Sequence, residues 1–371
     1  MIQPERLEQL FLDLVAIDSE SYNERRLCDY LKKSLASFTN DIQEDNAGAS
    51  FGGNAGNLIA CIRGNAHAPR ILLNAHMDVI APANAVRAVR QRDIIRSDGK
   101  TNLGADDKAG IACIMETLHT LHDNNLPHGD LLIIFTVAEE THLKGVRALA
   151  TGHYRDVDFG YTLDSTGRAG DIITRSPSHK TIAARVTGRA AHAGMEPEKG
   201  TNAIWVASRA ISRMTLGRID SETTANIGII KGGRATNIVP DQVEVTGEAR
   251  SHSPEKLDAH IDHIIACLER TAKEFGAGVK TGVQPEYSAY DMAPDSAVVR
   301  HAVDAAQSIG LEPVLKSSGG GSDANVFNAA GLPVVPLGAA MQNPHSTDEF
   351  VNVTELADVA RFTLALVHAS S

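Results

Sequence analysis

The chain has 371 residues, of which 43% are hydrophobic and 22% charged, as in an ordinary globular protein of two or more domains. Its formal net charge is −11, and it has no basic run and no basic stripe with interleaved aromatic residues, so no nucleic-acid partner is expected. No stretch approaches the roughly 18 to 20 consecutive apolar residues of a membrane-spanning helix, so no membrane partner is expected either.

Two further features indicate a cytoplasmic protein. The N-terminal segment MIQPERLEQLFLDLVAI is acidic and amphipathic, whereas an export signal has a basic flank, an apolar stretch and a small-residue cleavage site. The cysteines stand far apart without any CxxC pair, so neither a disulfide framework nor a thiolate zinc site is indicated. A reducing, cytoplasmic location is therefore expected.

Helices and strands are predicted to alternate in the first part of the chain and again after about residue 290. The run 131–137 is continuously apolar, as in a strand that is buried on both faces of a parallel sheet. The pattern predicts an α/β domain with a mixed, mostly parallel sheet and helices on both faces. The predicted helices are 4–16, 22–37, 107–122 and 297–309, and the predicted strands are 57–63, 71–76, 131–137, 159–163 and 332–337.

The middle of the chain follows a different pattern. Its order of strand, helix, two strands, helix and strand is the split βαβ order of an α+β, ferredoxin-like domain. The second of its helices is predicted to begin after the N-cap Ser253 and to end before Gly276. We therefore expect one discontinuous domain, 1–179 and 286–371, interrupted by an inserted domain, 180–285. The inserted elements are strands 181–187, 225–231, 242–250 and 278–283 and helices 201–214 and 254–275.

Histidine and acidic residues follow directly after several predicted strands. In open α/β sheets, ligands bind outside the carboxyl ends of the strands, so these side chains are expected to converge. A further acidic pair, Asp106 and Asp107 in LGADDKAG, opens a helix, where free amides and the helix dipole stabilise carboxylates. The residues that follow strands are His76 and Asp78 in NAHMDV, Glu139 and Glu140 in FTVAEE, Asp164 in YTLDSTG, and His345 in NPHSTDEF.

This set of residues predicts a site for two metal ions. Histidine and carboxylate ligands without cysteine suit zinc, with cobalt or manganese as substitutes. Two ions about 3.5 to 4 Å apart need a shared carboxylate because bare cations repel each other, and we assign Asp106 as that bridge. His76 and Asp164 then complete one ion and Glu140 and His345 the other, which leaves each ion an open position for water or substrate.

Glu139 and Glu140 are expected to have different roles, because neighbouring side chains of a strand point to opposite sides. One of them can bind an ion while the other takes the proton from metal-bound water and hands it to the leaving amine. Asp78 lies two residues after His76 and can accept the second imidazole N–H, which would fix the tautomer. Asp78 is therefore expected to support the site without binding an ion.

Together these residues resemble the signature of the di-metal peptidase superfamily that includes peptidase T, carboxypeptidase G and aminoacylase. The resemblance spans nearly the whole chain. Two stretches, GRAAHAGMEPEKGTNAI and KGGRATNIVPDQ, are most similar to the peptidase T-like, tripeptide-aminopeptidase branch. One segment departs from the pattern: the glutamates are followed by THLKG, where relatives commonly place an apolar residue and glycine directly.

The resemblance carries several further expectations. It implies a zinc-binding catalytic domain with two zinc ions per subunit, the ligand set given above, Glu139 as the base, and a cis peptide bond after Asp106. It also implies that the inserted domain is a lid through which two chains form a homodimer. His192, in a loop of small residues in this lid, is then expected to reach the site of the partner subunit and to stabilise the oxyanion.

Three other residues are candidates for substrate contacts. Arg250 and Asn237 could bind a substrate carboxylate or carbonyl through directed hydrogen bonds. Gly320 lies in the run GGGSD, which lacks the lysine and the spacing of a phosphate-binding loop and is interpreted as a tight turn that lines the substrate site.

These features predict a metallopeptidase of the tripeptidase type, which removes the N-terminal residue of a short peptide with metal-bound hydroxide as nucleophile and Glu139 as general base. The same residues would serve an amidohydrolase, a carboxypeptidase or an N-acyl amino acid deacylase, since sequence does not show whether a free amine or a free carboxylate is bound. A metal-binding module without catalysis is a third alternative. An intact Glu139 argues against that alternative, because binding the ions does not require this residue.

Overall fold

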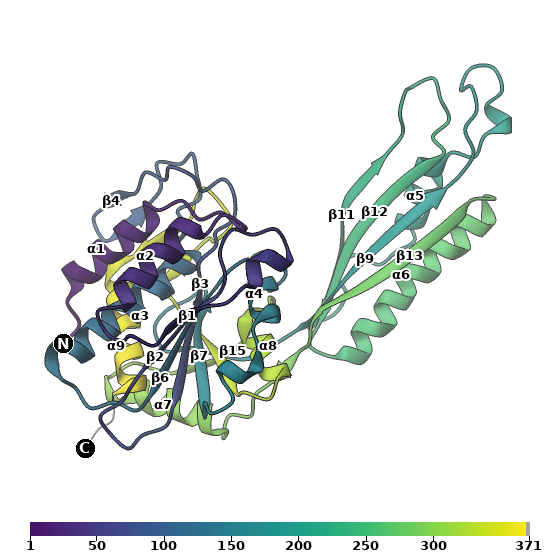
Figure 1. Cartoon of the computed structure of the whole chain (residues 1–371). Helices are drawn as coiled ribbons and strands as arrows, with labels where there is room; N and C mark the ends of the chain where they lie inside the picture. Colours follow the sequence, from purple (N-terminus) through teal and green to yellow (C-terminus); the bar gives the residue numbers. More distant parts are fainter. Residues whose placement is uncertain (369–371) are drawn as a thin grey trace. The chain divides into compact units, whose positions relative to one another are not determined.

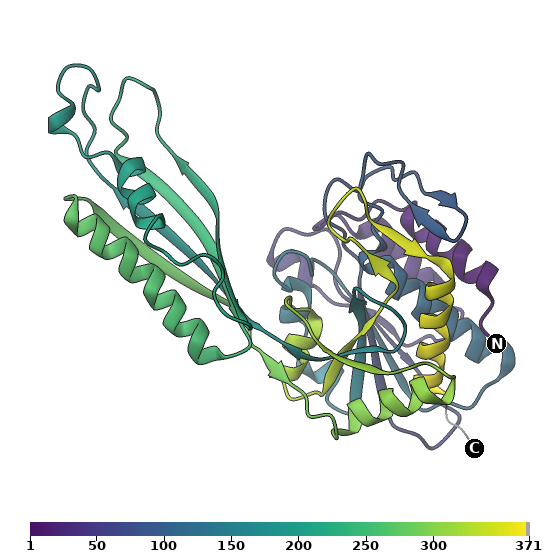
Figure 2. The same cartoon turned by 180° about the vertical axis from the view of Figure 1, so that it is seen from behind.

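The computed structural model describes residues 1–368, which form two compact units (Figures 1 and 2). We call them the large unit and the inserted unit. The large unit comprises Met1–Thr174, Asp291–Ser317 and the chain from Ser322 onward, and the inserted unit comprises Arg175–Tyr290 and Ser318–Gly321. The range 180–285, expected from the sequence for an inserted domain, falls inside the inserted unit.

The large unit is built on a nine-stranded mixed sheet with the order β1-β2-β6-β3-β7-β16-β8-β14, in which β15 also pairs with β8. Its centre, β6-β3-β7-β16, is parallel, and β2 and β8 flank this centre as antiparallel neighbours. The strands are β1 (Ile42–Glu44), β2 (Leu58–Ile62), β3 (Ile71–His76), β6 (Leu131–Thr136), β7 (Phe159–Ser165), β8 (Asp171–Ser176), β14 (Tyr290–Asp291), β15 (Val314–Ser317) and β16 (Val334–Gly338).

Helices cover this sheet on both faces, which confirms the predicted fold class. Helices α1 and α9 pack against α3, which lies on β3 and β7, and α8 packs against β7 and β16 from the other face (Figure 1). Every residue of β3 and β6 is buried, because both faces of these strands are covered. The helices are α1 (Pro4–Val15), α2 (Arg25–Leu35), α3 (Ala105–Asn124), α4 (Lys144–Ala148), α7 (Ala297–Ser308), α8 (Asp323–Ala329) and α9 (Val353–Val367). Among residues 1–368, no helix has the length and apolar character needed to cross a membrane.

A second, four-stranded sheet of the large unit was not predicted. Its order is β17-β18-β5-β4, and each strand has only two or three residues, too few to produce a recognisable alternation of apolar and polar side chains. The strands are β4 (Val89–Gln91), β5 (Ile94–Arg96), β17 (Met341–Gln342) and β18 (Phe350–Asn352). This sheet matters for the site because the turn between β17 and β18 carries His345.

The inserted unit is an antiparallel sheet with the order β10-β11-β12-β9-β13 and two helices, which confirms the predicted ferredoxin-like order of elements. Its longest helix, α6, begins as expected: Ser253 caps it by accepting a hydrogen bond from the backbone N–H of Lys256. Gly276 follows the helix end with φ at 63°. The elements are β9 (Ser178–Thr187), α5 (Ala203–Ile211), β10 (Gly217–Arg218), β11 (Thr223–Gly232), β12 (Gln242–Ser251), α6 (Pro254–Glu274) and β13 (Gly278–Tyr287).

A buried ion pair joins α1 to α3 in the large unit, and its loss should destabilise the fold. The Glu116 carboxylate is fully buried and accepts hydrogen bonds from Arg6 Nε at 2.6 Å and Nη2 at 3.0 Å. Arg6→Ala leaves this carboxylate without its cation, so we expect the free energy of unfolding to fall by about 2 to 4 kcal/mol. Arg63→Ala is the matched control, because Arg63 pairs with Asp130 while 77% exposed, and it should have a much smaller effect. Urea denaturation of both variants tests this, and equal losses would contradict it.

Candidate metal centre

The side chains predicted to bind ions converge at one edge of the large sheet. His76 is the last residue of β3 and pairs in register with Thr136, the last residue of β6. Glu139 and Glu140 come shortly after Thr136, so they leave the sheet at the same edge as His76. Asp164 stands near the end of β7, which runs parallel to β3. Because parallel strands end at a common edge, three elements far apart in the sequence deliver ligand-type side chains to one place.

Asp106 lies between two histidines and faces each with a different oxygen. His76 Nε2 is 3.0 Å from Asp106 Oδ1, and His345 Nε2 is 3.3 Å from Asp106 Oδ2. Each histidine also approaches a second carboxylate: His76 Nε2 is 3.8 Å from Asp164 Oδ1, and His345 Nε2 is 3.0 Å from Glu140 Oε1. The structure therefore presents two groups of one imidazole and one carboxylate that share Asp106.

Two aspartates are available at the start of α3, and their contacts distinguish them. The ligand atoms of His76, Asp107 and Asp164 lie within 4.8 Å of one another, as do those of His76, Asp106 and Glu140. Both oxygens of Asp107, however, accept backbone N–H bonds, from His76 at 3.1 Å and Gly110 at 3.2 Å. Asp107 thus holds the backbone of His76, whereas Asp106 offers both oxygens to the histidines. The peptide bond between the two aspartates is cis, as the resemblance implied.

The charges of this cluster show that it suits cations. Burial lowers the pKa of His76, but hydrogen bonds to Asp106 and Asp78 outweigh burial and raise that pKa well above its usual range. Hydrogen bonds to Asp106 and Glu140 raise the pKa of His345 to about 10. Burial raises the pKa of Asp106, but the two histidines outweigh it and hold that pKa below its usual range. The carboxylates thus favour the protonated, positively charged form of both imidazoles. Divalent ions bound between these groups would provide positive charge in place of the protons.

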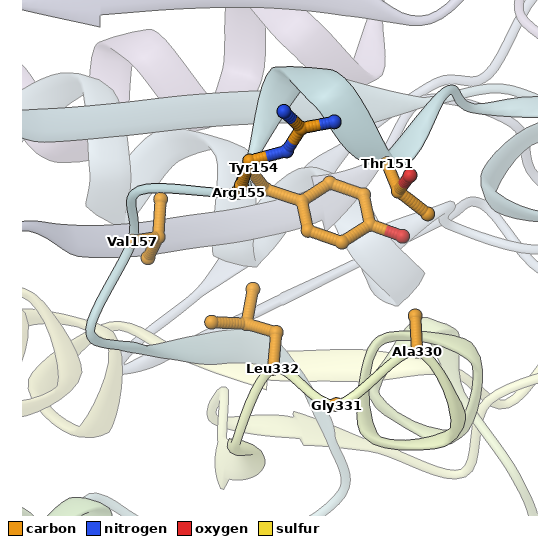
Figure 3. Close-up of a pocket in the computed structure, with 7 residues that line it drawn as sticks. All are labelled: Thr151, Tyr154, Arg155, Val157, Ala330, Gly331 and Leu332. Atoms are coloured by element: carbon orange, nitrogen blue, oxygen red, sulfur yellow. The ribbon is translucent and has the colours of Figure 1, made fainter.

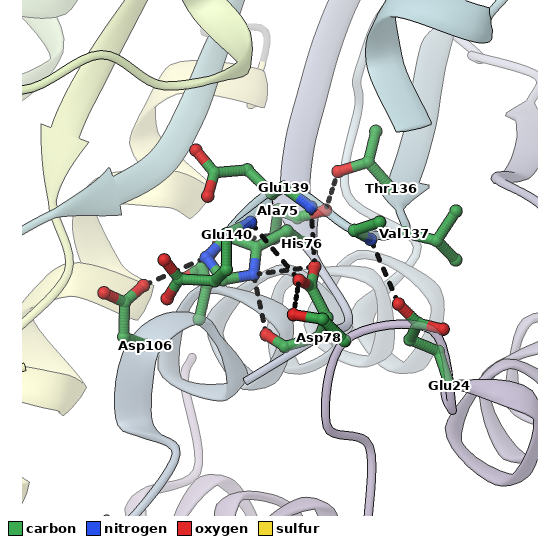
Figure 4. A network of polar contacts seen from close by, with 12 residues as sticks. Glu24, Ala75, His76, Asp78, Asp106, Thr136, Val137, Glu139 and Glu140 are labelled. Carbon is green, nitrogen blue, oxygen red and sulfur yellow. Dashed lines mark hydrogen bonds and ion pairs between the residues drawn. The ribbon is translucent and has the colours of Figure 1, made fainter. Parts of the chain in front are cut away.

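Asp78 is fully buried and supports the site differently from the prediction. His76 Nδ1 is 2.8 Å from the backbone carbonyl oxygen of Asp78 but 3.5 Å from its carboxylate, so the carbonyl is the nearer acceptor for the imidazole N–H. The carboxylate instead accepts the backbone N–H groups of Glu139 at 2.8 Å and Glu140 at 3.2 Å, together with the hydroxyl of Ser21 at 2.7 Å. Asp78 therefore fixes the direction in which both glutamates leave the chain (Figure 4).

The carboxylates of Glu139 and Glu140 lie in different surroundings. The Glu140 carboxylate lies beside Asp106 and His76, whereas that of Glu139 extends away from them (Figure 4). Burial raises the pKa of Glu139 well above its usual range, which the nearby His76 opposes and Glu140 reinforces. Within residues 1–368 no side chain or backbone group is hydrogen-bonded to the Glu139 carboxylate. The Glu139 carboxylate is thus buried, has a raised pKa and has no hydrogen bond to the described residues, which suits a group that accepts and donates a proton.

Sequence reasoning missed two buried carboxylates that shape the site. Glu24 accepts the backbone N–H of Ala138, just before the glutamate pair, at 3.1 Å. Glu349, four residues after His345, accepts backbone N–H bonds in the segment that carries Asp106. Neither has a local signal that separates it from other acidic residues. Glu349 could have been noticed only because it stands in the same segment, NPHSTDEF, as His345.

His192 and Asn237 lie on adjoining loops of the inserted unit. The backbone N–H of Ala193 donates to the carbonyl of Asn237 at 2.9 Å. The exposed ring of His192 accepts the N–H groups of Gly194 at 3.2 Å and Met195 at 3.1 Å, both on Nδ1. A neutral ring held in this way carries its hydrogen on Nε2, so His192 presents a hydrogen-bond donor to its surroundings.

Arg250 and Gly320 meet at another place in the inserted unit. The guanidinium of Arg250 is held by both oxygens of Glu248, at 3.1 and 3.0 Å. A Cβ on Gly320 would lie 3.7 Å from Arg250 Nη1, and one on Gly321 would lie 2.3 Å from the ring of Tyr287. The glycine turn thus fits closely against Arg250 and Tyr287, and a side chain at position 321 would force this packing apart.

A separate pocket of the large unit, with a volume of about 270 Å³, does not offer comparable chemistry (Figure 3). Tyr154, Leu332 and Arg155 are among its lining residues, and Arg155 is the one charged residue among them. The lining contains no histidine, cysteine or carboxylate, so it offers none of the side chains that bind zinc in proteins.

Comparisons with known proteins identify the family of the chain. Residues 72–369 match the family described as peptidase family M20/M25/M40. The crystal structure of aminopeptidase PepT from Bacillus cereus is 41% identical, with a TM-score of 0.88, over 99% of this chain and 98% of that one. A tripeptidase from Staphylococcus aureus is 38% identical, with a TM-score of 0.94 and the same coverage. A Bacillus subtilis protein described as a dinuclear metal-binding peptidase of the M20 family shares the fold, with a TM-score of 0.72 and 20% identity. The match covers 98% of this chain and 97% of that one. The chain belongs to the M20/M25/M40 peptidase family, in its peptidase T-like branch.

Proposed function

We propose that this chain is a two-metal aminopeptidase that removes the N-terminal residue of short peptides, in particular tripeptides. The observation that carries the proposal is the position of Asp106, whose two oxygens face His76 and His345 separately. A carboxylate with this placement is suited to bridge two cations. The substrate class is supported by the whole-chain similarity to proteins described as an aminopeptidase and a tripeptidase.

The side chains fit two zinc ions, for which cobalt or manganese could substitute. His76, Asp106 and Asp164 would hold one ion, and Asp106, Glu140 and His345 the other. Bound there, the ions would supply positive charge that polarises the scissile carbonyl and lowers the pKa of water. No cysteine takes part in this ligand set. The location that we propose is the cytoplasm, whose reducing conditions keep thiols such as these four cysteines free.

The residues of the chain would then move the proton and orient the site. Glu139 would accept the proton of the attacking water and pass it to the amine that leaves. Asp78 holds the backbone of Glu139 and, through its carbonyl, the imidazole of His76, so both keep their direction during this transfer. His192 would donate from Nε2 to the oxygen that gains negative charge when the carbonyl is attacked.

We assign the inserted unit as a lid through which two chains form a homodimer. Strand β10 pairs only with Thr224 and Ala225 of β11, so the later part of β11 lies at the edge of the sheet. On that edge Ile229 and Ile230 are about half exposed, at 48% and 49%, and Trp205 of α5 is 49% exposed. An unpaired edge strand with exposed large apolar side chains is suited to pairing with a second copy.

A hydrolysis panel tests the proposed substrate class. We expect the metal-loaded protein to cleave tripeptides with a free amine and to release their first residue, and to leave the N-acetylated forms of the same tripeptides intact. Dipeptides and N-acyl amino acids should be poor substrates. Mass spectrometry of the products identifies the bond that is cut.

Each alternative predicts a different result from this panel. Cleavage of N-acyl amino acids, or release of the C-terminal residue, would assign the chain to the deacylase or carboxypeptidase alternative and overturn the aminopeptidase proposal. No cleavage of any compound by protein with both ions bound would leave a metal-binding module without catalysis.

A further inference from the structure

Glu349 connects the two chain segments that carry Asp106 and His345. It stands at the end of the turn between β17 and β18, four residues after His345, and is 1% exposed. Its Oε2 accepts the backbone N–H of Gly104 at 2.7 Å, and its Oε1 accepts that of Asp106 at 2.9 Å. Both oxygens are therefore engaged with backbone amides, one of them belonging to the shared aspartate.

The segment that carries His345 needs such an attachment. Ala340, Asn343 and His345 all have positive φ, at 62°, 52° and 62°, a region that residues other than glycine rarely occupy. The His345 side chain is 50% exposed, so packing alone does not define its place. At its far end the turn is anchored by β18, which pairs with both β17 and β5.

The other half of the site shows the same arrangement with Asp107. This buried carboxylate accepts the backbone N–H of His76 and uses its second oxygen on Gly110. Each histidine segment is thus tied to the start of α3 by a buried acid whose oxygens bind backbone N–H groups: Asp107 for His76, and Glu349 for His345. The similarity of the two contacts indicates that both acids hold a histidine segment in place against the start of α3.

We propose that Glu349 is a positioning residue that fixes Asp106 relative to His345 and so builds the second ion site, although it does not bind an ion itself. This inference rests on the proposed two-metal function. A charged acceptor on two amides holds them more firmly than a neutral one, and residues that orient metal ligands typically change metal affinity about 10- to 100-fold when replaced.

Glu349→Gln tests the proposal, with Asp348→Asn as the matched control. Glutamine has the same shape but a single acceptor oxygen, and its NH₂ group would face one of the two amides. Asp348 is exposed, and its replacement removes the same charge one residue away. Metal-free full-length protein is titrated with zinc by calorimetry and with cobalt(II) by absorption. We expect the parent and Asp348→Asn to bind two ions alike, and Glu349→Gln to bind its second ion about 10- to 100-fold more weakly.

Two further measurements separate positioning from other roles. Turnover lost in Glu349→Gln should return when the ion concentration is raised above the weakened affinity, which would not occur if Glu349 acted in the chemical step. In the parent protein, the amides of Gly104 and Asp106 should exchange slowly with deuterium even without metal, because Glu349 accepts them. This second measurement needs no variant, so fast exchange could still contradict the inference if Glu349→Gln does not fold.

The results that overturn the inference differ from those that overturn the proposed function. Two ions bound equally well by Glu349→Gln and the parent, or fast exchange of the Gly104 and Asp106 amides, would show that Glu349 does not position the site. A parent protein that binds fewer than two ions would instead contradict the two-metal function. Glu349 could then have no role in building a second ion site.

Discussion

Glu139→Gln is expected to lower turnover by about 10²- to 10⁴-fold while both ions remain bound. Glutamine keeps the size of the side chain but cannot accept a proton from the attacking water. The buried carboxylate of Glu139 has no hydrogen-bond partner within residues 1–368, so its loss breaks no described contact and should leave the fold intact. Steady-state kinetics on a tripeptide, together with metal analysis of the same sample, measures both parts of this expectation.

The neighbouring Glu140→Gln is the matched control for this experiment. Glu140 Oε1 lies 3.0 Å from His345 Nε2 and faces the shared Asp106, so this variant should lose affinity for one ion. The two variants change adjacent residues of the same kind but should differ in metal content. If Glu139→Gln loses an ion and Glu140→Gln keeps both, the assigned roles are reversed.

His192→Ala is expected to reduce turnover about 100- to 1,000-fold with unchanged metal content, as for the loss of one donor to an oxyanion. The two amides that bind Nδ1 leave Nε2–H as the donor of a neutral ring. Met195→Ala is a suitable control, because it removes an exposed side chain from the same loop and retains the backbone N–H that binds His192. Turnover in His192→Ala that matches this control would mean that the histidine is simply a solvated lid residue.

A mixing experiment tests whether His192 acts in the partner subunit. Inactive His192→Ala chains combined with inactive Glu139→Gln chains should regain partial activity after subunit exchange, because one site of the mixed dimer then has both an intact base and an intact donor. Exchange is verified independently with differently tagged chains. Confirmed exchange without any return of activity would exclude action of His192 across the dimer.

The sequence predicted the central elements of the fold closely, for identifiable reasons. Strands β3 and β6 are continuous apolar runs because both their faces are covered, and the predicted ranges 71–76 and 131–137 nearly coincide with them. Helix α6 carries its own start and stop signals in Ser253 and Gly276. The sheet β17-β18-β5-β4 left no such signal, since its short strands are defined by pairing between distant segments.

The sequence predicted which side chains would lie close together, but not every contact that they make. Residues that follow parallel strands must meet at one edge, so the proximity of His76, Asp164 and Glu140 follows from the order of elements. The acids that orient the site, such as Asp107 and Glu349, bind backbone N–H groups of segments that folding brings to them. Sequence cannot distinguish these acids from ligands. The sequence also predicted that Asp78 lies beside His76. It did not predict that the imidazole would lie nearer to the backbone carbonyl oxygen of Asp78 than to its carboxylate.

The most direct test of the proposed two-metal function is to measure tripeptide hydrolysis against metal content in the same samples. The protein is stripped with a chelator, its remaining metal is determined, and zinc, cobalt or manganese is added back stepwise. We expect hydrolysis to disappear with the ions and to return in full only as the content approaches two ions per chain. Full hydrolysis by exhaustively metal-free protein would contradict the two-metal mechanism.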